Sequence, residues 1–556
     1  MELLANGEFR LTAPNSVAAT LFMAANGCLS ATSAEIKNTN IADLSKTNNG
    51  QEESLQLEVQ VAVKGFEFAG NTVFTAAELA EQIQPFANKS LTFAQILEAR
   101  DTITDFYRDK GYITSRAAIR PQTSTDGKVT IEAVEGTLGD VRVSSSGGLS
   151  SNYIASRLEA EPDTPLNVDR LAQKLQMLQL DPLIASISAE LSAHPLSNET
   201  ILEVGVKEPP SFNAVVMLDN DRSPSAGSFR RQVRAEQTNL LGMGDRLSLG
   251  HSRTDGSNTW DASYLLPLNR HNGSLQFNYS TAASKIVEPP FDRVDIEADS
   301  VAYSLSYRQP ISRKISNTEI EELALGLRAD RRESQTSLLG KNYPLAPGAD
   351  ENGETRISAL RFFQDWTKRS DRQVLALRSE LSWGLGLFEA SVSESEPDGQ
   401  FLSWRGQGQL TRLLAPDTLL LLRGDLQLAV GSLVPLEQFS LGGSRSVRGY
   451  RTDALLADNG ANASLELRLP IYKSPGRNTI IQVSPFLDLG AVWNSGGQAN
   501  PSSSILASTG LGLRLQFGDK LGARLDWGIP LIDVDDSRNR TWQENGFSFS
   551  LEANPF

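Results

Sequence analysis

Apolar and polar residues alternate along most of the chain that follows Pro210, and this alternation limits the possible folds more than any other feature. In one segment Val301, Tyr303, Leu305 and Tyr307 are separated by smaller or polar residues. Because successive side chains of a β-strand point to opposite faces, the pattern predicts strands with one apolar and one polar face. A membrane β-barrel and a soluble β-sandwich both contain such strands, so periodicity alone leaves both folds open.

Strand length and the composition of the polar phase favour the barrel. The alternation from Leu375 to Leu387 is long enough to cross a bilayer as a tilted strand. Near the C-terminus the polar phase carries glycine and charges of both signs, as expected of a wet lumen, at Arg514, Arg524 and Asp526. We therefore predict an all-β transmembrane barrel over residues 211–556. Phe556 is the terminal residue typical of outer-membrane barrels, although Pro555 interrupts strand pairing.

The region before the barrel has a mixed pattern of helices and strands. Residues 57–138 predict the order strand, helix, helix, strand, strand, and both helices begin with a capping box, at Thr75 with Glu78 and at Thr92 with Gln95. The same order returns more weakly over residues 139–210. We therefore predict two tandem α+β modules.

The N-terminal segment resembles an export signal only in part. Residues 1–34 contain a short apolar stretch followed by small residues near Ser33, but acidic residues outnumber basic ones before that stretch. We predict either an atypical signal or a displaced start. Cleavage near Ser33 would remove Cys28, the one cysteine of the chain. Residues 35–56 are polar and aperiodic, which predicts a linker.

Composition argues against several classes of function. The net charge of −15 argues against a nucleic-acid partner, because phosphate contacts need clustered Lys and Arg. One cysteine and three scattered histidines, His194, His251 and His271, favour no metal site and no His-based triad, and we predict no cofactor. The GGSRS stretch around Ser444 lacks the second glycine of a nucleophile elbow. We predict that the protein is not an enzyme.

Several motifs together carry a family resemblance. In the first module these are GNTVF, FYRDKGY and IRPQTSTDGKVTIEAVEGTLG, and farther along the chain they are NLLGMGDRLSLG, YLLPL, YRQP, FSLGGSRSVRGYR and SPFLDLG. From about Val61 to the C-terminus the chain resembles two-partner secretion transporters of the haemolysin-activator and filamentous-haemagglutinin transporter type. The resemblance implies two periplasmic POTRA domains, 57–138 and 139–210, followed by an outer-membrane barrel of about sixteen antiparallel strands. Some members of that family carry an N-terminal plug helix, for which no counterpart precedes Leu57.

The resemblance also implies a site inside the barrel. The loop 439–453 would fold into the lumen and carry the motif residues Gly442, Gly443, Val447, Arg448, Gly449 and Tyr450. Its arginine would meet an acidic residue of the wall, and the strand that supplies the partners Phe486, Asp488 and Gly490 has the required phase, because the apolar Leu487 and Leu489 point the other way. The alternative is an ordinary hairpin tip with an arginine on the surface.

A second candidate site lies in the first module. POTRA domains of the resembling family present an open sheet edge, where an unfolded chain can add a strand. The edge segment that we predict consists of Ile113, Thr114, Ser115, Arg116, Ala117, Ala118 and Ile119. The alternative is a strand with a purely structural role, and the sequence does not separate the two.

The combined prediction is an outer-membrane protein translocator. It would export one large β-helical exoprotein, an adhesin or haemolysin, in extended form and without ATP, and folding of the cargo outside would bias the movement. Its partners would be that secreted protein and outer-membrane lipid. The alternatives are a factor that assembles other outer-membrane barrels and, less favoured, a passive pore. The sequence leaves the identity of the cargo and the oligomeric state open.

Overall fold

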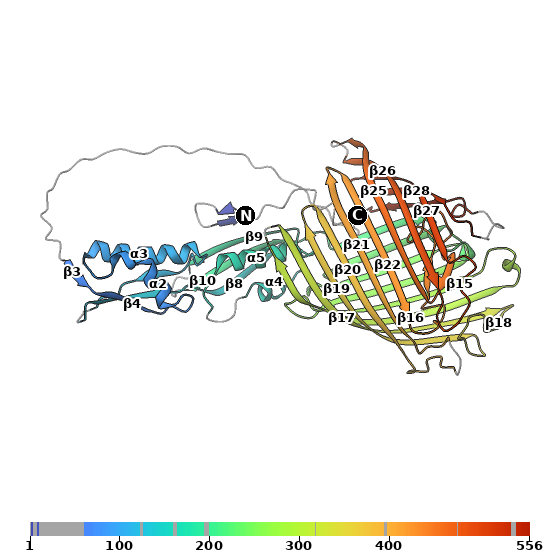
Figure 1. Cartoon of the computed structure of the whole chain (residues 1–556), viewed down its shortest axis with the longest axis horizontal. Coiled ribbons are helices and arrows are strands. Elements are labelled where there is room, and N and C mark those ends of the chain that lie inside the picture. The colour runs from blue at the N-terminus through green and yellow to red at the C-terminus, as the bar shows by residue number, and fades with distance from the viewer. Residues whose placement is uncertain are drawn as a thin grey trace. The chain divides into compact units, whose positions relative to one another are not determined.

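The computed structural model describes residues 2–3, 8–10, 60–122, 126–159, 164–193, 199–316, 318–393, 397–474, 476, 478–534 and 541–555. The described chain forms two compact units that meet in sequence at Pro209 and Pro210 (Figure 1). The predicted linker 35–56, Cys28, His194 and Phe556 lie outside the described residues, as does nearly all of the predicted signal. Only the short strands β1 (Glu2–Leu3) and β2 (Glu8–Arg10) are described there.

The first α+β module packs two helices against a three-stranded sheet. The sheet has the order β4-β7-β6, with β4 parallel and β6 antiparallel to β7, and strands β3 and β5 form a separate pair. Its elements are β3 (Gln60–Val63), β4 (Gly65–Ala69), α2 (Ala76–Gln82), η1 (Gln84–Phe86), β5 (Lys89–Thr92), α3 (Phe93–Asp109), β6 (Arg116–Ala118) and β7 (Lys128–Val134). The side chains between helices and sheet are buried and apolar, as in Leu79, Ile83, Ile103, Tyr107 and Ile131.

Local chemistry explains where these helices begin. Both predicted capping boxes are confirmed, with the hydroxyl of Thr75 accepting from the Glu78 amide at 3.3 Å and that of Thr92 from the Gln95 amide at 3.2 Å. The hydrogen bonds to Thr75 lower the pKa of the Glu78 carboxyl. Gly111 follows α3 with φ +86°, a left-handed conformation that ends a helix at little cost for glycine.

The second α+β module repeats the pattern. The strands β8 (Thr137–Ser145), β9 (Ser186–Ala193) and β10 (Glu199–Lys207) pair in the order β9-β10-β8, and the described backbone of β2 pairs with β9. Helices α4 (Ser151–Leu158) and α5 (Val168–Gln179) supply the apolar core together with this sheet. Asn167 caps α5, because its side-chain oxygen accepts from the amides of Asp169 and Arg170.

The second unit is a closed antiparallel barrel of sixteen long strands, which confirms the predicted fold. The two-residue strand β18 (Lys341–Asn342) only extends one hairpin. The long strands are β11 (Phe212–Asp219), β12 (Arg230–Thr238), β13 (Arg246–Arg253), β14 (Ser257–Pro267), β15 (Ser274–Lys285), β16 (Ile296–Ile315), β17 (Glu319–Leu338), β19 (Glu354–Ser370), β20 (Gln373–Leu385), β21 (Leu402–Ala415), β22 (Thr418–Ala429), β25 (Asn459–Ser474), β26 (Thr479–Trp493), β27 (Ile505–Phe517), β28 (Leu521–Pro530) and β29 (Phe547–Ala553).

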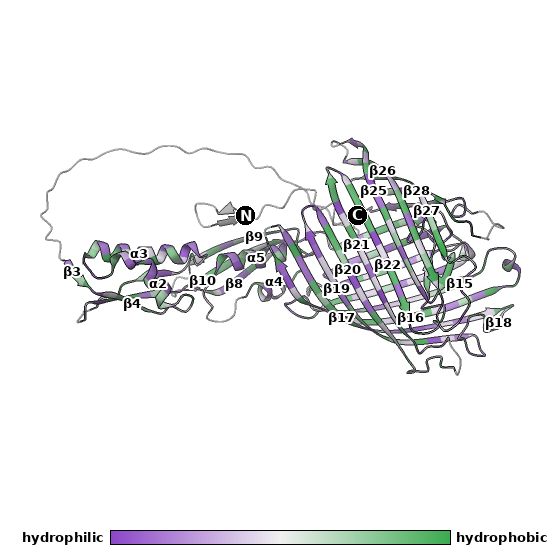
Figure 2. Ribbon diagram, in the orientation of Figure 1, coloured by the Kyte–Doolittle hydropathy of each residue, from purple (hydrophilic) through white to green (hydrophobic). Residues whose placement is uncertain are grey.

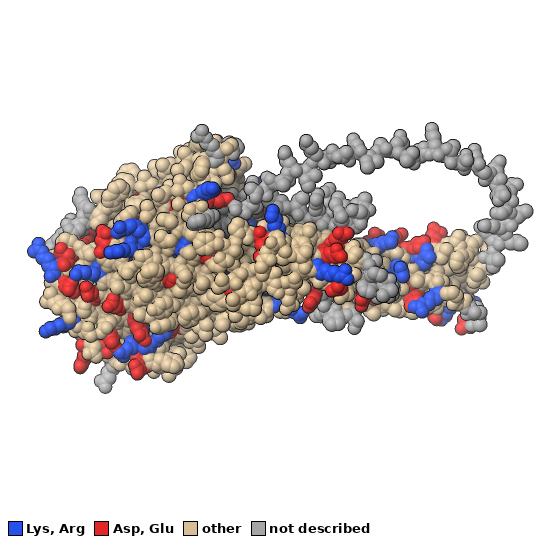
Figure 3. All heavy atoms as spheres, turned by 180° about the vertical axis from the view of Figure 1, so that it is seen from behind, with Lys and Arg blue, Asp and Glu red and all other residues tan. Residues whose placement is uncertain are grey.

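The two faces of the strands follow the alternation of the sequence (Figure 2). The apolar phase points outward, with Tyr303, Leu305 and Tyr307 on β16 all exposed. The charged side chains of the barrel gather toward one of its ends, and few of them interrupt the band across its middle (Figure 3). An outward apolar band with charges beyond it is the surface expected of a barrel in a bilayer. No helix among the described residues is long and apolar enough to cross a membrane.

The boundaries of some predicted elements differ from the structure. The predicted edge segment over residues 113–119 contains a shorter strand, because β6 covers only Arg116–Ala118. Residues 112–115 instead form a turn in which the Ser115 amide donates to the Tyr112 carbonyl at 3.0 Å. The short strand β5 was not predicted, because its four residues are too few to show a period and lie directly before a strong helix signal.

Candidate functional site in the barrel lumen

The segment between β22 and β25, residues 430–458, folds back against the inner wall of the barrel. Two short antiparallel strands, β23 (Phe439–Leu441) and β24 (Leu455–Ala457), form its base. The segment shares an apolar cluster with the wall residues Val492 and Leu506, in which it contributes Phe439, Leu441, Val447, Tyr450, Leu455 and Ala457. Burial of this much apolar surface inside a polar lumen fixes the segment, which we call the lumenal loop.

Arg448 lies at the tip of the lumenal loop and meets two acidic residues of the wall. Its Nε and Nη2 donate to the two carboxylate oxygens of Asp488 on β26, at 2.7 and 2.8 Å. Its Nη1 donates to Glu466 on β25 at 2.8 Å, and Nη2 also reaches the Ser464 hydroxyl at 3.2 Å. The Arg448 side chain is 3% exposed and that of Asp488 is fully buried. Fork geometry of this kind suits arginine and not lysine.

The surroundings of Arg448 strengthen these contacts. The guanidinium carbon lies 3.5 Å from the centre of the Phe486 ring, which is a close cation–π contact. Burial lowers the pKa of the Arg448 guanidinium, but the hydrogen bond and charge of Asp488, joined by Glu466, outweigh burial and hold that pKa above its ordinary value. Arg448 therefore keeps its charge at every accessible pH, and titration of this group does not release the loop.

Glycines of the wall make room for the loop. A Cβ atom at Gly490 would lie 2.4 Å from the Cδ1 atom of Leu441. At Gly528 on β28 a Cβ atom would lie 2.5 Å from the backbone nitrogen of Gly449. Gly449 has φ +91°, a conformation that favours glycine. The backbone of Gly449 can therefore pack directly against the backbone of Gly528, because neither residue has a side chain. In the FLDLG stretch Phe486 thus stacks on Arg448, Asp488 binds it and Gly490 admits Leu441.

Strand β27 and two connections between strands hold the residues that follow Arg448. The Tyr450 hydroxyl lies 2.8 Å from the carbonyl oxygens of Ala507 and Ile532. Arg451 binds Glu288 at 2.7 Å and Glu544 at 3.1 Å, and these residues belong to two different connections between strands. The tip of the lumenal loop is therefore tied to several parts of the barrel as well as to the wall.

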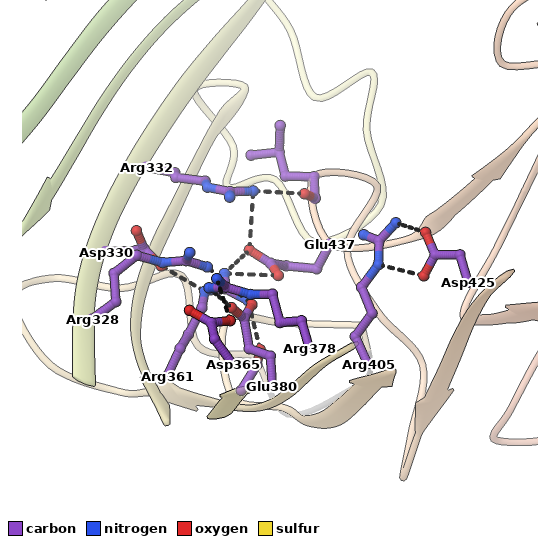
Figure 4. A network of polar contacts seen from close by, with 12 residues as sticks. Arg328, Asp330, Arg332, Arg361, Asp365, Arg378, Glu380, Arg405, Asp425 and Glu437 are labelled. Carbon is purple, nitrogen blue, oxygen red and sulfur yellow. Dashed lines mark hydrogen bonds and ion pairs between the residues drawn. The ribbon is translucent and has the colours of Figure 1, made fainter. Parts of the chain in front are cut away.

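A second ion network holds the first arm of the lumenal loop on a different part of the wall (Figure 4). Glu437 accepts from Arg361 Nη2 with both carboxylate oxygens, at 2.7 and 2.9 Å, and both side chains are 6% exposed. Arg361 on β19 also donates to Asp330 on β17 at 2.6 Å. From Asp330 the network continues through the strand residues Arg328, Glu380, Arg378 and Asp365. Arg332 adds a hydrogen bond to the Leu436 carbonyl at 3.1 Å.

Sequence reasoning brought Arg448 and Asp488 together but missed the other acidic residues of the site. Glu466 lies on the polar phase of β25, so the sequence could assign it to the lumen, but only the register, which places it opposite Phe486, brings it within reach of Arg448. Glu437 has no such signal, because its partner Arg361 comes from a strand 76 residues away. The predicted edge segment belongs to the first module, and its strand β6 does lie at a sheet edge. The Ala117 amide on that edge already donates to the Thr104 hydroxyl at 3.0 Å.

Among the described residues no cluster of His, Cys, Asp and Glu has the arrangement of a metal site. Three buried acidic residues of the site, Glu437, Glu466 and Asp488, are instead paired with arginines. Their chemistry is that of ion pairs that hold chain segments together. The arrangement can fix a loop and can release it when a competing charge arrives.

Comparison with known proteins agrees with this architecture. Residues 61–136 match the POTRA domain of ShlB type. The outer membrane transporter CdiB of Escherichia coli O6:K15:H31 (strain 536) is 22% identical over 483 residues, which cover 84% of this chain and 78% of that protein. The heme/hemopexin transporter protein HuxB of Haemophilus influenzae (strain 86-028NP) is 25% identical, and the alignment covers 31% of each chain.

Solved structures show the same fold. CdiB from Escherichia coli superposes with a TM-score of 0.66 at 20% identity, over 91% of this chain and 92% of that one. BamA from Haemophilus ducreyi lacking POTRA domains 1–3 has a TM-score of 0.52 at 14% identity, over 89% of this chain and all of that one. Residues 198–515, more than half of the chain, match the model of the haemolysin secretion/activation proteins ShlB/FhaC/HecB. The chain, with its POTRA-type module and its sixteen-stranded barrel, therefore belongs to the ShlB/FhaC/HecB family of haemolysin secretion/activation proteins.

Proposed function

We propose that this protein is an outer-membrane translocator that exports one large secreted protein through its barrel. Both α+β modules would act in the periplasm as POTRA domains and receive the unfolded cargo. The names of CdiB and HuxB describe transporters, and family membership supports the same activity here. The protein is not an enzyme under this proposal, since its buried charged groups serve to hold a movable loop.

The observation that carries the proposal is the docking of the lumenal loop through Arg448. A loop that is tied into the lumen by ion pairs, with Asp488 and Glu466 as partners, obstructs passage and can be displaced. A permanently structural plug would be served equally well by apolar packing, which replaces buried ion pairs at little cost in stability. An ion pair can be exchanged for contacts with another charged group, so the loop can leave its docked position. A transporter whose lumen is obstructed by a loop requires such a displacement.

The cargo would first pair with an edge strand of the first module. β6 is an edge strand of its sheet, and extended chains bind such edges through main-chain hydrogen bonds. Because the amides of Ser115 and Ala117 already donate to Tyr112 and Thr104, an incoming strand would pair with the remaining backbone groups of Ile113–Ile119. Transport would need no ATP, because cargo that folds outside cannot slide back.

Deletion of the gene, followed by comparison of secreted and outer-membrane proteins, tests the proposal. Loss of one large secreted protein with normal levels of other barrels supports export. Loss of many barrels would instead favour an assembly factor. This alternative is considered because BamA has a similar fold. A change in solute permeability alone would favour a passive pore.

The Arg448→Ala variant tests the role of the loop. We expect secretion to fall at least tenfold while the barrel still inserts, because removal of the arginine leaves two buried carboxylates with fewer partners. Secretion of the exoprotein is measured in the medium, and insertion is measured by the heat-modifiable migration of the barrel. Export at the wild-type level from an inserted barrel would contradict the loop hypothesis.

A further inference from the structure

Four arginines line the inner wall beside the Arg448 site, and the ion pairs that they form are with residues of the wall and not with the loop itself. Arg423, Arg468, Arg514 and Arg524 come from β22, β25, β27 and β28, and all four lie on the phase that faces the lumen. We call them the lumenal arginine cluster. The side chains of Arg468, Arg514 and Arg524 are 14 to 22% exposed, so part of each side chain faces the open space of the lumen.

The register of the strands places like charges opposite one another. Arg514 on β27 is the direct cross-strand partner of Arg524 on β28. Like charges at directly opposite positions destabilise a sheet. Arg524 contacts Asp526 on its own strand, while the Nε atoms of Arg514 and Arg524 are buried and make no hydrogen bond with any residue that the structure describes. The ion pairs of Arg514 with Glu466 and of Arg524 with Asp526 offset part of this repulsion but leave donors of both guanidinium groups unused, which suggests that these groups serve another purpose.

The acidic residues of this region do not balance the arginines. Glu466 alone accepts from Arg448, Arg468 and Arg514, each at 2.8 Å. With Arg448 included, five guanidinium groups face the three carboxylates of Glu466, Asp488 and Asp526, which leaves two positive charges in excess.

The positive charge of Arg423 is the least compensated by carboxylates among the four arginines. It lies opposite Ser464, one level from Glu466, and makes no ion pair with any residue in the described part of the chain. It interacts electrostatically with Glu466 but also with the positive charges of Arg448, Arg468 and Arg524. A positive excess is notable in a chain whose net charge is −15.

We infer that the lumenal arginine cluster is a binding site for carboxylate groups of an extended acidic polypeptide in transit. Arginine forks match carboxylates in geometry, and two guanidinium groups on neighbouring strands can hold one Asp or Glu side chain between them. This inference rests on the proposed export function and narrows the substrate class to a chain with acidic segments.

The cluster is coupled to the lumenal loop through Glu466. A carboxylate of the cargo that binds Arg514 and Arg524 relieves their mutual repulsion and competes with Glu466 for Arg514. Glu466 and Arg448 are then free to rearrange together with Asp488. Binding of an acidic segment thus acts on the contacts that hold Arg448, and a neutral segment does not.

The test uses the purified full-length protein in detergent and a fluorescein-labelled oligoglutamate peptide, with binding followed by fluorescence anisotropy. We expect saturable binding to the wild type that weakens as salt is added, and no binding of an oligoserine peptide. The R514Q/R524Q variant should bind about tenfold more weakly, equivalent to ~1.4 kcal/mol. R514K/R524K keeps both charges and should retain binding better than R514Q/R524Q.

The control variant R234Q/R246Q removes two arginines from the lumen-facing phase of β12 and β13, away from the cluster. Equal weakening in this control would overturn the inference, since any positive charge in the lumen would then suffice. Unchanged binding by a folded R514Q/R524Q variant would overturn it as well. Normal export by R514Q/R524Q despite weakened peptide binding would overturn the inference that the cluster binds cargo during transport. Because the binding assay needs no export, its outcome stays separate from the secretome test of the proposed function.

Discussion

The contact between Glu437 and Arg361 provides the sharpest quantitative test of how the lumenal loop is held. In Glu437→Ala, Arg361 loses two hydrogen bonds of 2.7 and 2.9 Å, but it keeps Asp330 at 2.6 Å and the Ser382 hydroxyl at 2.7 Å. Removing one partner of a buried ion pair costs about 3–5 kcal/mol, and the remaining partners of Arg361 favour the lower value. We therefore expect a loss of about 3 kcal/mol, roughly a hundredfold in the opening equilibrium of the loop arm.

Glu437 and Arg448 share no partner among the described residues, so the loss should stay local. Arg448 depends on Asp488, Glu466 and Ser464, and none of these contacts Glu437. Free energies at sites without shared partners add. Glu437→Ala should expose the arm at residues 430–438 and leave the protection of residues 447–450 near that of the wild type.

Hydrogen–deuterium exchange of the full-length protein in detergent measures both regions at once. Protection should fall roughly a hundredfold in 430–438 of Glu437→Ala and in 447–450 of Arg448→Ala. Glu437→Gln serves as the matched control, because the amide oxygen can still accept from Arg361 and the loss should be smaller. If Glu437→Ala lowers protection equally in both regions, the loop opens as one unit and the argument for two independent attachments is refuted.

Two further predictions concern a wall glycine and a helix cap. Gly528→Ala places a Cβ atom 2.5 Å from the Gly449 nitrogen and should lower the unfolding temperature, at a cost of about 1–3 kcal/mol, whereas Gly522→Ala on the same strand has nothing within 4 Å and should not. Thr75→Ala removes the cap of α2 and should destabilise the first module by about 1 kcal/mol in chemical unfolding. Because the pKa of Glu78 is lowered in the folded state, the ionised Glu78 carboxylate stabilises the module above pH 4.5, and this stabilisation is lost as the pH falls through the folded pKa. Thr75→Ala should weaken this pH dependence of the unfolding free energy.

The sequence predicted the faces of the barrel strands because alternation and strand geometry share the same period. Leu487 and Leu489 are exposed outward and Asp488 is buried inward, as the phase required. Capping boxes were equally predictable, since they depend on residues three positions apart. The short strand β5 and the true length of β6 were not, because β5 has too few residues to show a period and the turn at residues 112–115 shortens β6.

The missed residues of the lumenal site have a common physical cause. Periodicity states which face a side chain occupies, but the level at which it meets a neighbour depends on the register and on where a long connection returns to the wall. Arg514 and Arg524 could each be assigned to the lumen from the sequence, yet only the pairing of β27 with β28 places them directly opposite one another. Glu437 lies on no strand at all, so its partner could be known only after the fold of the loop was known. The ion pairs that hold the loop and the excess of positive charge that we assign to cargo binding therefore both depend on the register of the strands. A shift of one strand by two residues would leave every side chain on its original face, but it should abolish both the ion pairs and the arginine cluster.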